Sequence, residues 1–249
     1  MSEAARVIVL SISARLQNGE DTVHPAVVYD GAQAILIDTC LPGAARQIMD
    51  AMEEAGVPLS ALTHIVLTHA DMDHTGSLKE LLALAPKNVQ VLCHEREKSY
   101  VQGDVPPLRL AAMEAAVENM MGEKRAQFSA LANNLRANYK SLAVPITGTV
   151  EDGEMLPCGV QVIFTPGHTP GHISLYLKSS RTLITGDVLS VLSGELLPAP
   201  DWSVGDKELM RASLKKLAEL DIETAVCFHG GVFSDSVHQR LLKIAGMNQ

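Results

Sequence analysis

The chain has 249 residues, of which 47% are hydrophobic and 20% are charged, a composition typical of a folded protein rather than a disordered one. Its formal net charge of −9, without any basic stripe, disfavours a nucleic acid as partner. No apolar run reaches the roughly 20 residues of a membrane span, no secretory signal pattern is present, and the four cysteines form no CxxC pair, so we expect a cytoplasmic protein that does not bind a membrane.

Short strands and helices alternate in the first part of the chain. Runs rich in β-branched residues, bounded by turn residues, predict strands at residues 6–13, 26–29, 34–38, 63–68 and 89–93. Asp30-Gly31 is a hairpin signal between two of these strands. Helices are predicted at residues 42–55, with Gly56 just past the end, and at residues 78–84.

Residues 106–140 have a different composition. Met113, Phe128, Leu131 and Leu135 lie among Ala, Glu, Asn and Arg, and strand-forming residues are few. This composition predicts one or two helices inserted into the alternating pattern. Such an insert could cap an active site or could pack on the core as a helical hairpin, and Met-rich faces are compatible with both.

The alternating pattern resumes after the insert. Strands are predicted at residues 160–164, 173–177, 182–184 and 224–228, and helices at residues 207–220 and 234–244, with Ser234 as the N-cap of the last one. No linker or short repeat interrupts residues 1–249, which favours a single domain. Two similar αβ halves in an α/β (α+β) chain predict two sheets packed together with helices outside.

Four potential metal ligands follow the strand at residues 63–68. His69, Asp71, Asp73 and His74 occur within six residues, where the strand passes into a helix. Side chains two positions apart in an extended segment point the same way, so His69 and Asp71 could converge on one ion, and Asp73 and His74 on a second. A solvated helix N-terminus with incidental histidines is the alternative interpretation.

Three later strands are also followed by a residue that can bind a metal. His168 lies in the Pro-Gly-rich turn TPGHTPGH, Asp187 stands in TGD, and His229 stands in FHGG. Loops at strand ends are where functional sites are built. Four such strand ends are hard to ascribe to chance, and together they favour a metal site.

These motifs resemble those of the metallo-β-lactamase superfamily. THADMDHTG is similar to its HxHxDH signature, and TPGHTPGH, TGD and FHGG are similar to its later ligand motifs, in the same order. The resemblance spans nearly the whole chain and implies an αββα sandwich with two metal ions at one edge of the sheets. Carried over by position, the first ion would be held by His69, Asp71 and His168, the second by Asp73, His74 and His229, and Asp187 would bridge them.

Asp71 departs from that pattern, in which the second residue of the signature is His. A third carboxylate makes the site more neutral and shifts its preference from zinc toward iron or manganese. Asp71 could be a true ligand, it could be too short to reach the first ion, or the site could be degenerate.

His172 matches no ligand position and is expected to support the predicted ligands from the second shell of contacts. His24, His64, His94 and His238 match no ligand motif, so they are interpreted as surface or core residues.

The resemblance implies a metal-dependent hydrolase that holds two divalent ions, zinc first and iron or manganese as alternatives. A metal-bridging hydroxide would attack a small ester, lactone or thioester, with Asp73 as the catalytic residue that orients it. Asp187 disfavours antibiotic hydrolysis, and the short chain after His229 disfavours a glutathione substrate. The alternatives are a di-iron redox protein similar to flavodiiron proteins, with a separate electron donor, and a non-catalytic binder. A small-molecule substrate is the expected partner, and symmetry statistics favour a homodimer.

Overall fold

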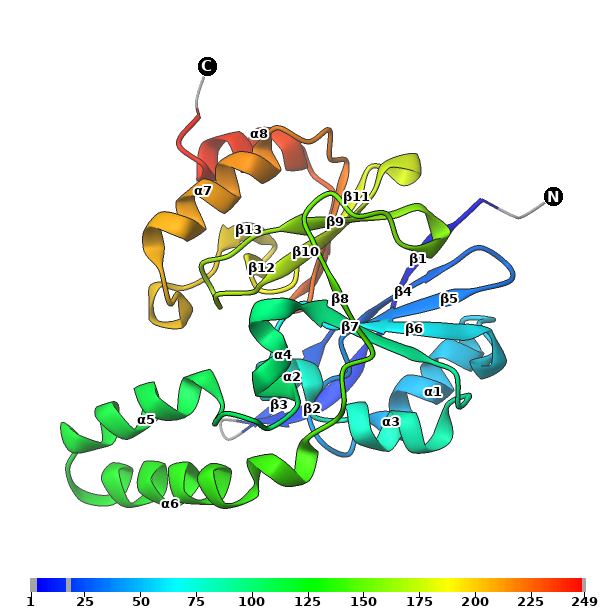
Figure 1. The fold of residues 1–249 in the computed structure, drawn as a ribbon. Coiled ribbons are helices and arrows are strands. Elements are labelled where there is room, and N and C mark those ends of the chain that lie inside the picture. Colours follow the sequence, from blue (N-terminus) through cyan, green and yellow to red (C-terminus); the bar gives the residue numbers. More distant parts are fainter. Residues whose placement is uncertain (1–3, 17–18, 248–249) are drawn as a thin grey trace.

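Two β-sheets lie face to face in the computed structural model, which describes residues 4–16 and 19–247 (Figure 1). The strands of the first sheet are, in spatial order, β1 (Arg6–Val9), β4 (Ala26–Tyr29), β5 (Ala34–Ile37), β6 (Leu62–Val66), β7 (Gln90–His94) and β8 (Gly148–Val150). β1, β4 and β5 pair antiparallel, and β5 to β8 pair parallel.

The second sheet has five strands, of which one neighbouring pair is parallel. In spatial order they are β15 (Gly231–Phe233), β14 (Thr224–Cys227), β11 (Thr182–Ile184), β10 (Ile173–Leu177) and β9 (Val160–Phe164). β11 and β14 run parallel, while the other neighbours pair antiparallel. The carboxyl ends of β11 and β14 therefore meet at one edge of this sheet.

The layer between the sheets is made of β-branched and leucine side chains. Alternate residues of β5 show how it forms: Ile35 and Ile37 pack with Val162 and Leu175 of the second sheet. The residues between them, such as Leu36, belong to the core on the opposite face of the first sheet. A strand buried on both faces has a continuous apolar sequence, which explains the run AILI.

Helices cover the outer face of each sheet. α1 (Ala45–Glu54) and α3 (Leu78–Leu84) bury Ile48, Met52 and Leu81 against the first sheet. α7 (Lys207–Ala218) and α8 (Val237–Ile244) cover the second sheet, and Met210, Leu214 and Leu217 of α7 form its apolar stripe. Three apolar layers between four layers of elements make the αββα sandwich that the sequence predicts.

The segment between β7 and β8 is helical. α4 (Glu95–Val101) follows β7 directly, and α5 (Leu108–Glu118) and α6 (Gly122–Asn138) form a hairpin that extends away from the sheets (Figure 1). An exposed ion pair between Arg136 and Glu114, at 2.6 Å, joins the two helices of the hairpin. These two helices lie within residues 106–140, the segment for which one or two helices were predicted. None of the described helices is long and apolar enough to cross a membrane.

Several elements differ from the sequence-based expectations. The strand predicted at residues 6–13 is divided, because β2 (Ile12–Leu16) leaves the first sheet and pairs with β3 (Gly19–Val23). Ser234 is not the N-cap of the last helix, since α8 begins at Val237, after Ser236. Further elements were not predicted from the sequence, among them the hairpin of β12 (Leu189–Leu192) and β13 (Glu195–Pro198), the short α2 (Met72–Thr75), and α4.

Candidate metal centre

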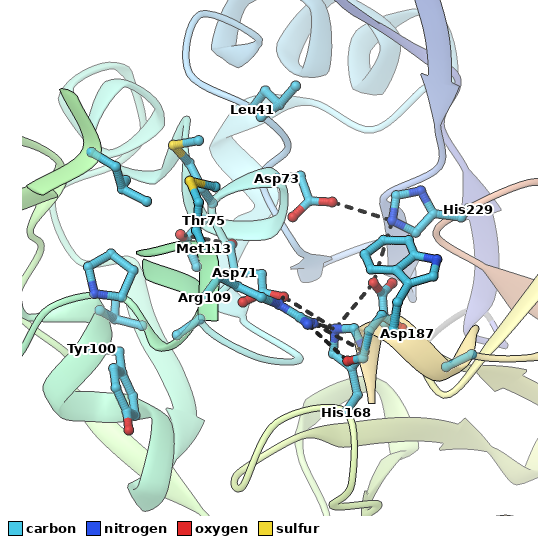
Figure 2. Close-up of a pocket in the computed structure, with 18 of the residues that line it drawn as sticks. Leu41, Asp71, Asp73, Thr75, Tyr100, Arg109, Met113, His168, Asp187 and His229 are labelled. Carbon is cyan, nitrogen blue, oxygen red and sulfur yellow. Dashed lines mark hydrogen bonds and ion pairs between the residues drawn. The ribbon is translucent and has the colours of Figure 1, made fainter. Parts of the chain in front are cut away.

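The structure brings all seven predicted ligand residues together at one end of the two sheets. Figure 2 shows Asp71, Asp73, His168, Asp187 and His229 of this set. Each stands in a segment just after a strand, so the two sheets hold these segments from both sides. The segment after β6, which includes the short helix α2, supplies four of them, and the loops after β9, β11 and β14 supply one each: His69, Asp71, Asp73, His74, His168, Asp187 and His229.

The ligand atoms form overlapping groups. His69, Asp71 and His168 place one atom each within 4.8 Å of one another, and so do Asp73, His74 and His229. A further group joins His69, His74 and Asp187 within the same limit. These groups match the two ligand sets that the resemblance implies.

Asp187 lies between the two ligand sets. Its Oδ2 is 3.5 Å from Nε2 of His168 on one side and 3.5 Å from Nε2 of His229 on the other. Its Oδ1 is 3.2 Å from Nε2 of His74. A single carboxylate in this place can contact ions in both sets, which is the position expected of a bridging ligand.

Hydrogen bonds behind the site fix which ring nitrogens face it. The Thr68 hydroxyl donates to Asp38 at 2.8 Å, so Nδ1 of His69, 3.0 Å from that hydroxyl, is the donor to Thr68. Nδ1 of His74 lies 2.8 Å from Oδ2 of Asp38, which can only accept. In the neutral tautomers of both rings, therefore, the lone pair of Nε2 points into the cluster.

Unpaired buried atoms in the cluster show that this set of donor atoms fits metal ions. Among the described residues, Nε2 of His69, Nε2 of His74 and Oδ1 of Asp187 are buried without a hydrogen-bond partner. Buried polar atoms are normally paired, because an unpaired one loses its hydration without compensation. Three such lone pairs that face one another are accounted for by cations bound between them.

The carboxylates make the cluster a strongly negative environment. Burial lowers the pKa of His229, but Asp187 and Asp73 more than offset it and raise that pKa to about 10. Burial likewise opposes ionisation of Asp71, yet its contacts with His168 and His69 and the charge of Arg109 hold its pKa well below the usual value. The site thus attracts positive charge, which metal ions supply.

Asp38 was missed as a site residue in the sequence analysis. It follows β5 directly, is buried, and accepts from the backbone N–H of Thr68 at 2.8 Å as well as from Thr68 Oγ1 and His74. The available signal was an acidic residue at the end of a continuous apolar strand, where an unpaired charge would be costly. Asp38 anchors the loop after β6 and orients His74.

His172 lies behind the predicted ligands and contacts the backbone next to one of them. Its Nε2 accepts the backbone N–H of Asp187 at 2.9 Å, and its Nδ1 lies 3.1 Å from the carbonyl of Thr165. Burial lowers its pKa well below the usual value, so the ring stays neutral. Gly186 packs against this ring with a φ of +55°, and a Cβ there would lie 2.5 Å from Nε2 of His172.

Glu97 on α4 joins two of the ligand loops and was also missed. Its Oε2 accepts the backbone N–H of Ala70 at 2.9 Å, between His69 and Asp71. Its Oε1 accepts the Thr169 hydroxyl at 2.8 Å and the backbone N–H of Gly171 at 2.6 Å, just after His168. A buried carboxylate therefore fixes the spacing of the two loops that supply the first ligand set.

We expect Glu97→Gln to loosen this connection. One carboxylate oxygen becomes an NH2 group, which faces a backbone N–H and leaves a buried donor unpaired. This lowers the free energy of unfolding by about 1–3 kcal/mol. Zinc affinity, measured by competition with a chromophoric chelator, should fall about 10-fold. Glu95→Gln is the matched control, since Glu95 is exposed on the same helix. An unchanged zinc affinity of Glu97→Gln would show that the loops do not depend on Glu97.

The other four histidines lie outside the cluster. His64 contacts Thr63 Oγ1 at 2.9 Å, His238 contacts the Leu220 carbonyl at 3.0 Å, and His94 accepts from the backbone N–H of Arg96 at the start of α4. His24 packs against the backbone of Gly231. None of them is among the metal-binding groups found in the described part of the chain.

A cavity of about 570 Å³ opens onto the cluster (Figure 2). Asp71, Asp73, His168, Asp187 and His229 all line it. Its other walls are largely apolar and include side chains of the α5–α6 hairpin and the exposed Trp202. The cluster is therefore open to a small molecule from this side.

Comparison with known proteins agrees with this arrangement. The model of the metallo-beta-lactamase superfamily matches residues 19–229. The chain belongs to this superfamily. It is 30% identical over 209 residues to "Probable metallo-hydrolase YflN" of Bacillus subtilis, with 79% of this chain and 75% of the relative covered. Superfamily membership and such names point to a metallo-hydrolase.

Solved structures share the fold. A metallo-beta-lactamase family protein from Thermus thermophilus superposes with a TM-score of 0.69 and 23% identity, covering 96% of this chain and 78% of that one. Among the sequence relatives, a hydroxyacylglutathione hydrolase of Mesorhizobium japonicum is 39% identical over 89 residues, which is 34% of this chain and 32% of the relative. The sequence-based predictions of family and fold are confirmed.

Proposed function

We propose that the chain is a binuclear metallohydrolase that cleaves a small ester, lactone or thioester. The observation that carries the proposal is the set of buried, unpaired lone pairs on His69, His74 and Asp187, which face one another beside the cavity that Asp187 lines. The hydroxyacylglutathione hydrolase similarity adds weight to a thioester, although it covers only a third of the chain.

Two ions would be held by the two ligand sets, with Asp187 between them. The predominance of imidazole favours zinc, and Asp71 leaves iron and manganese as alternatives. Such ions, when bound, lower the pKa of water and polarise a carbonyl oxygen.

The chain's own residues provide the remaining parts of the reaction. Asp73 is 3.3 Å from His229, and its side chain is partly exposed to the cavity, so it can accept the proton of the attacking water. Asp38 and Thr68 keep the proton of His74 and His69 on the ring nitrogen away from the site. The apolar walls of the cavity can pack against the acyl chain of a bound substrate.

A substrate panel tests this function. The protein, loaded in turn with zinc, manganese and iron, is assayed against esters, lactones and thioesters of short acyl groups. We expect turnover of at least one class, its loss on chelation, and its return with added ion. A fully loaded protein that cleaves no member of the panel would exclude the proposed function and favour a binding role.

A further inference from the structure

Arg109 of α5 reaches from the helical insert into the metal centre (Figure 2). Its Nε donates to Oδ2 of Asp71 at 2.7 Å, and one terminal nitrogen lies 2.6 Å from Nε2 of His168. The other terminal nitrogen donates to the carbonyl of Ser203 at 2.9 Å. Arg109 was not identified from the sequence, where it is one arginine on an ordinary helix.

The first two contacts use the atoms that would hold the first ion. Oδ2 of Asp71 and Nε2 of His168 belong to the first ligand set. The imidazole nitrogen has one lone pair, so a metal ion bound there displaces the guanidinium, and the charge of the ion repels the guanidinium from the Asp71 oxygen that it binds. The contact with Ser203 involves no ligand atom. When the first site holds an ion, Arg109 therefore keeps one partner and releases two nitrogens on the same edge of its guanidinium.

Arg109 lines the cavity beside the metal ligands. Arg109 is the one lysine or arginine among the described residues that line it, and 30% of its side chain is exposed. Two adjacent N–H groups on one edge of a guanidinium match the two oxygens of a carboxylate. Two divalent ions balance the charges of Asp71, Asp73, Asp187 and the proposed hydroxide, so the guanidinium of Arg109 is the positive group left to attract an anion.

The wall beside Arg109 is apolar. Met113 lies one turn further along α5. Leu135 comes from α6, and Tyr139 and Leu142 follow that helix directly. A short aliphatic chain can pack there by the hydrophobic effect. The cavity thus offers a cationic group and an apolar surface next to the metal ligands.

We propose that Arg109 binds a carboxylate of the substrate, and that the substrate is an ester or thioester of a short dicarboxylic acid. This inference rests on the proposed hydrolase function and names its substrate class. One carboxyl group of the acid is the scissile acyl group at the metal centre. The other, joined by an aliphatic linker, is held by the edge of Arg109 that the first ion releases.

A pair of chromogenic esters tests the proposal on the zinc-loaded protein. The p-nitrophenyl monoester of glutaric acid carries a free carboxylate, and the p-nitrophenyl methyl diester is its neutral counterpart. We expect the native protein to prefer the anionic ester. Arg109→Gln should lower the ratio of kcat/KM for the anionic ester to kcat/KM for the neutral ester about 10- to 100-fold, as expected for loss of a charge-assisted hydrogen bond.

Two further variants make the result specific. Arg109→Lys keeps the charge but loses the fork of donors, so it should retain an intermediate preference. Arg125→Gln removes an exposed arginine from α6 and should leave both esters unaffected. Zinc content is measured for every variant. Equal loss of activity on the two esters in Arg109→Gln, or no preference in the native protein, would contradict the proposal.

A binding measurement separates this proposal from the hydrolase function. Trp202, the single tryptophan of the chain, lines the cavity and is 84% exposed, so its fluorescence can report a bound ligand. Glutarate should bind the zinc-loaded native protein at least 10-fold more tightly than it binds Arg109→Gln. If neither ester is cleaved but this difference holds, hydrolysis of such esters is wrong and the role of Arg109 stands. If the esters are cleaved and glutarate binds both proteins equally, the hydrolase function stands and the role of Arg109 is wrong.

Discussion

Asp187→Asn is expected to lower kcat/KM of the metal-loaded protein by about 10³-fold, or about 4 kcal/mol of transition-state stabilisation. The substitution keeps the shape of the side chain and removes its charge. Asp187 is the carboxylate that lies between the two ligand sets, with Oδ1 toward His74 and Oδ2 toward His168 and His229. An amide can offer one oxygen but cannot bridge two cations with two.

The same variant should lose about one metal ion per chain. It should keep its fold, because Oδ1 of Asp187 makes no hydrogen bond with any described residue. Mass spectrometry of the bound metal and circular dichroism measure these two properties. Asp50→Asn, on the exposed face of α1, is the control for loss of one negative charge. Full activity and full metal content in Asp187→Asn would show that Asp187 does not bridge.

Asp38→Asn should reduce zinc affinity of the second ligand set about 100-fold, although Asp38 itself is not in that set. The carboxylate accepts from the backbone N–H of Thr68 and from Nδ1 of His74. An amide cannot accept both with separate oxygens, and its NH2 group can donate to Nδ1 of His74. The ring then carries its proton on Nε2, the nitrogen that faces the site, and that nitrogen cannot bind a metal.

Zinc titration with a competing chelator measures this effect. A matched control is Asp30→Asn, since Asp30 caps the exposed turn between β4 and β5 with one oxygen, a task that asparagine performs equally well. The chemical shifts of the His74 ring would report the change of tautomer. Native affinity in Asp38→Asn would mean that the orientation of His74 is set elsewhere.

The clustering of the candidate ligand residues could be predicted from the sequence because they follow strands that end at the same side of the fold. Asp187 and His229 follow short apolar strands that run parallel, and the ends of parallel neighbours meet at one edge. His69 follows another such strand. Their shared position at strand ends is visible in the sequence without any knowledge of pairing.

The supporting residues could not be predicted, because their partners are distant in the chain. Asp38 meets His74 after 36 residues, Glu97 meets Gly171 after 74, and Arg109 meets His168 after 59. A carboxylate on a helix usually faces solvent, and nothing in the sequence around Glu97 shows that α4 turns it into the core. Such contacts follow from the packing of whole layers.

The missed secondary structure has a similar explanation. The apolar pattern of β1 continues through Leu10 and Ile12, so the sequence does not show that the chain changes its partner after Val9. β12 and β13 form a separate hairpin, and their sequences contain few β-branched residues. This weakens the pattern by which a strand is predicted from the sequence. Ser234 resembles an N-cap by residue type, but the helix begins one turn later.

The most direct test of the binuclear site is the metal content of protein purified without chelator and without a metal-affinity tag, measured by plasma mass spectrometry. The two ligand sets predict about two divalent ions per chain, and zinc or manganese would agree with the proposed hydrolase. Two iron ions would agree with the site but favour the redox alternative. One ion per chain, or none after incubation with each metal, would contradict a binuclear centre built on Asp187.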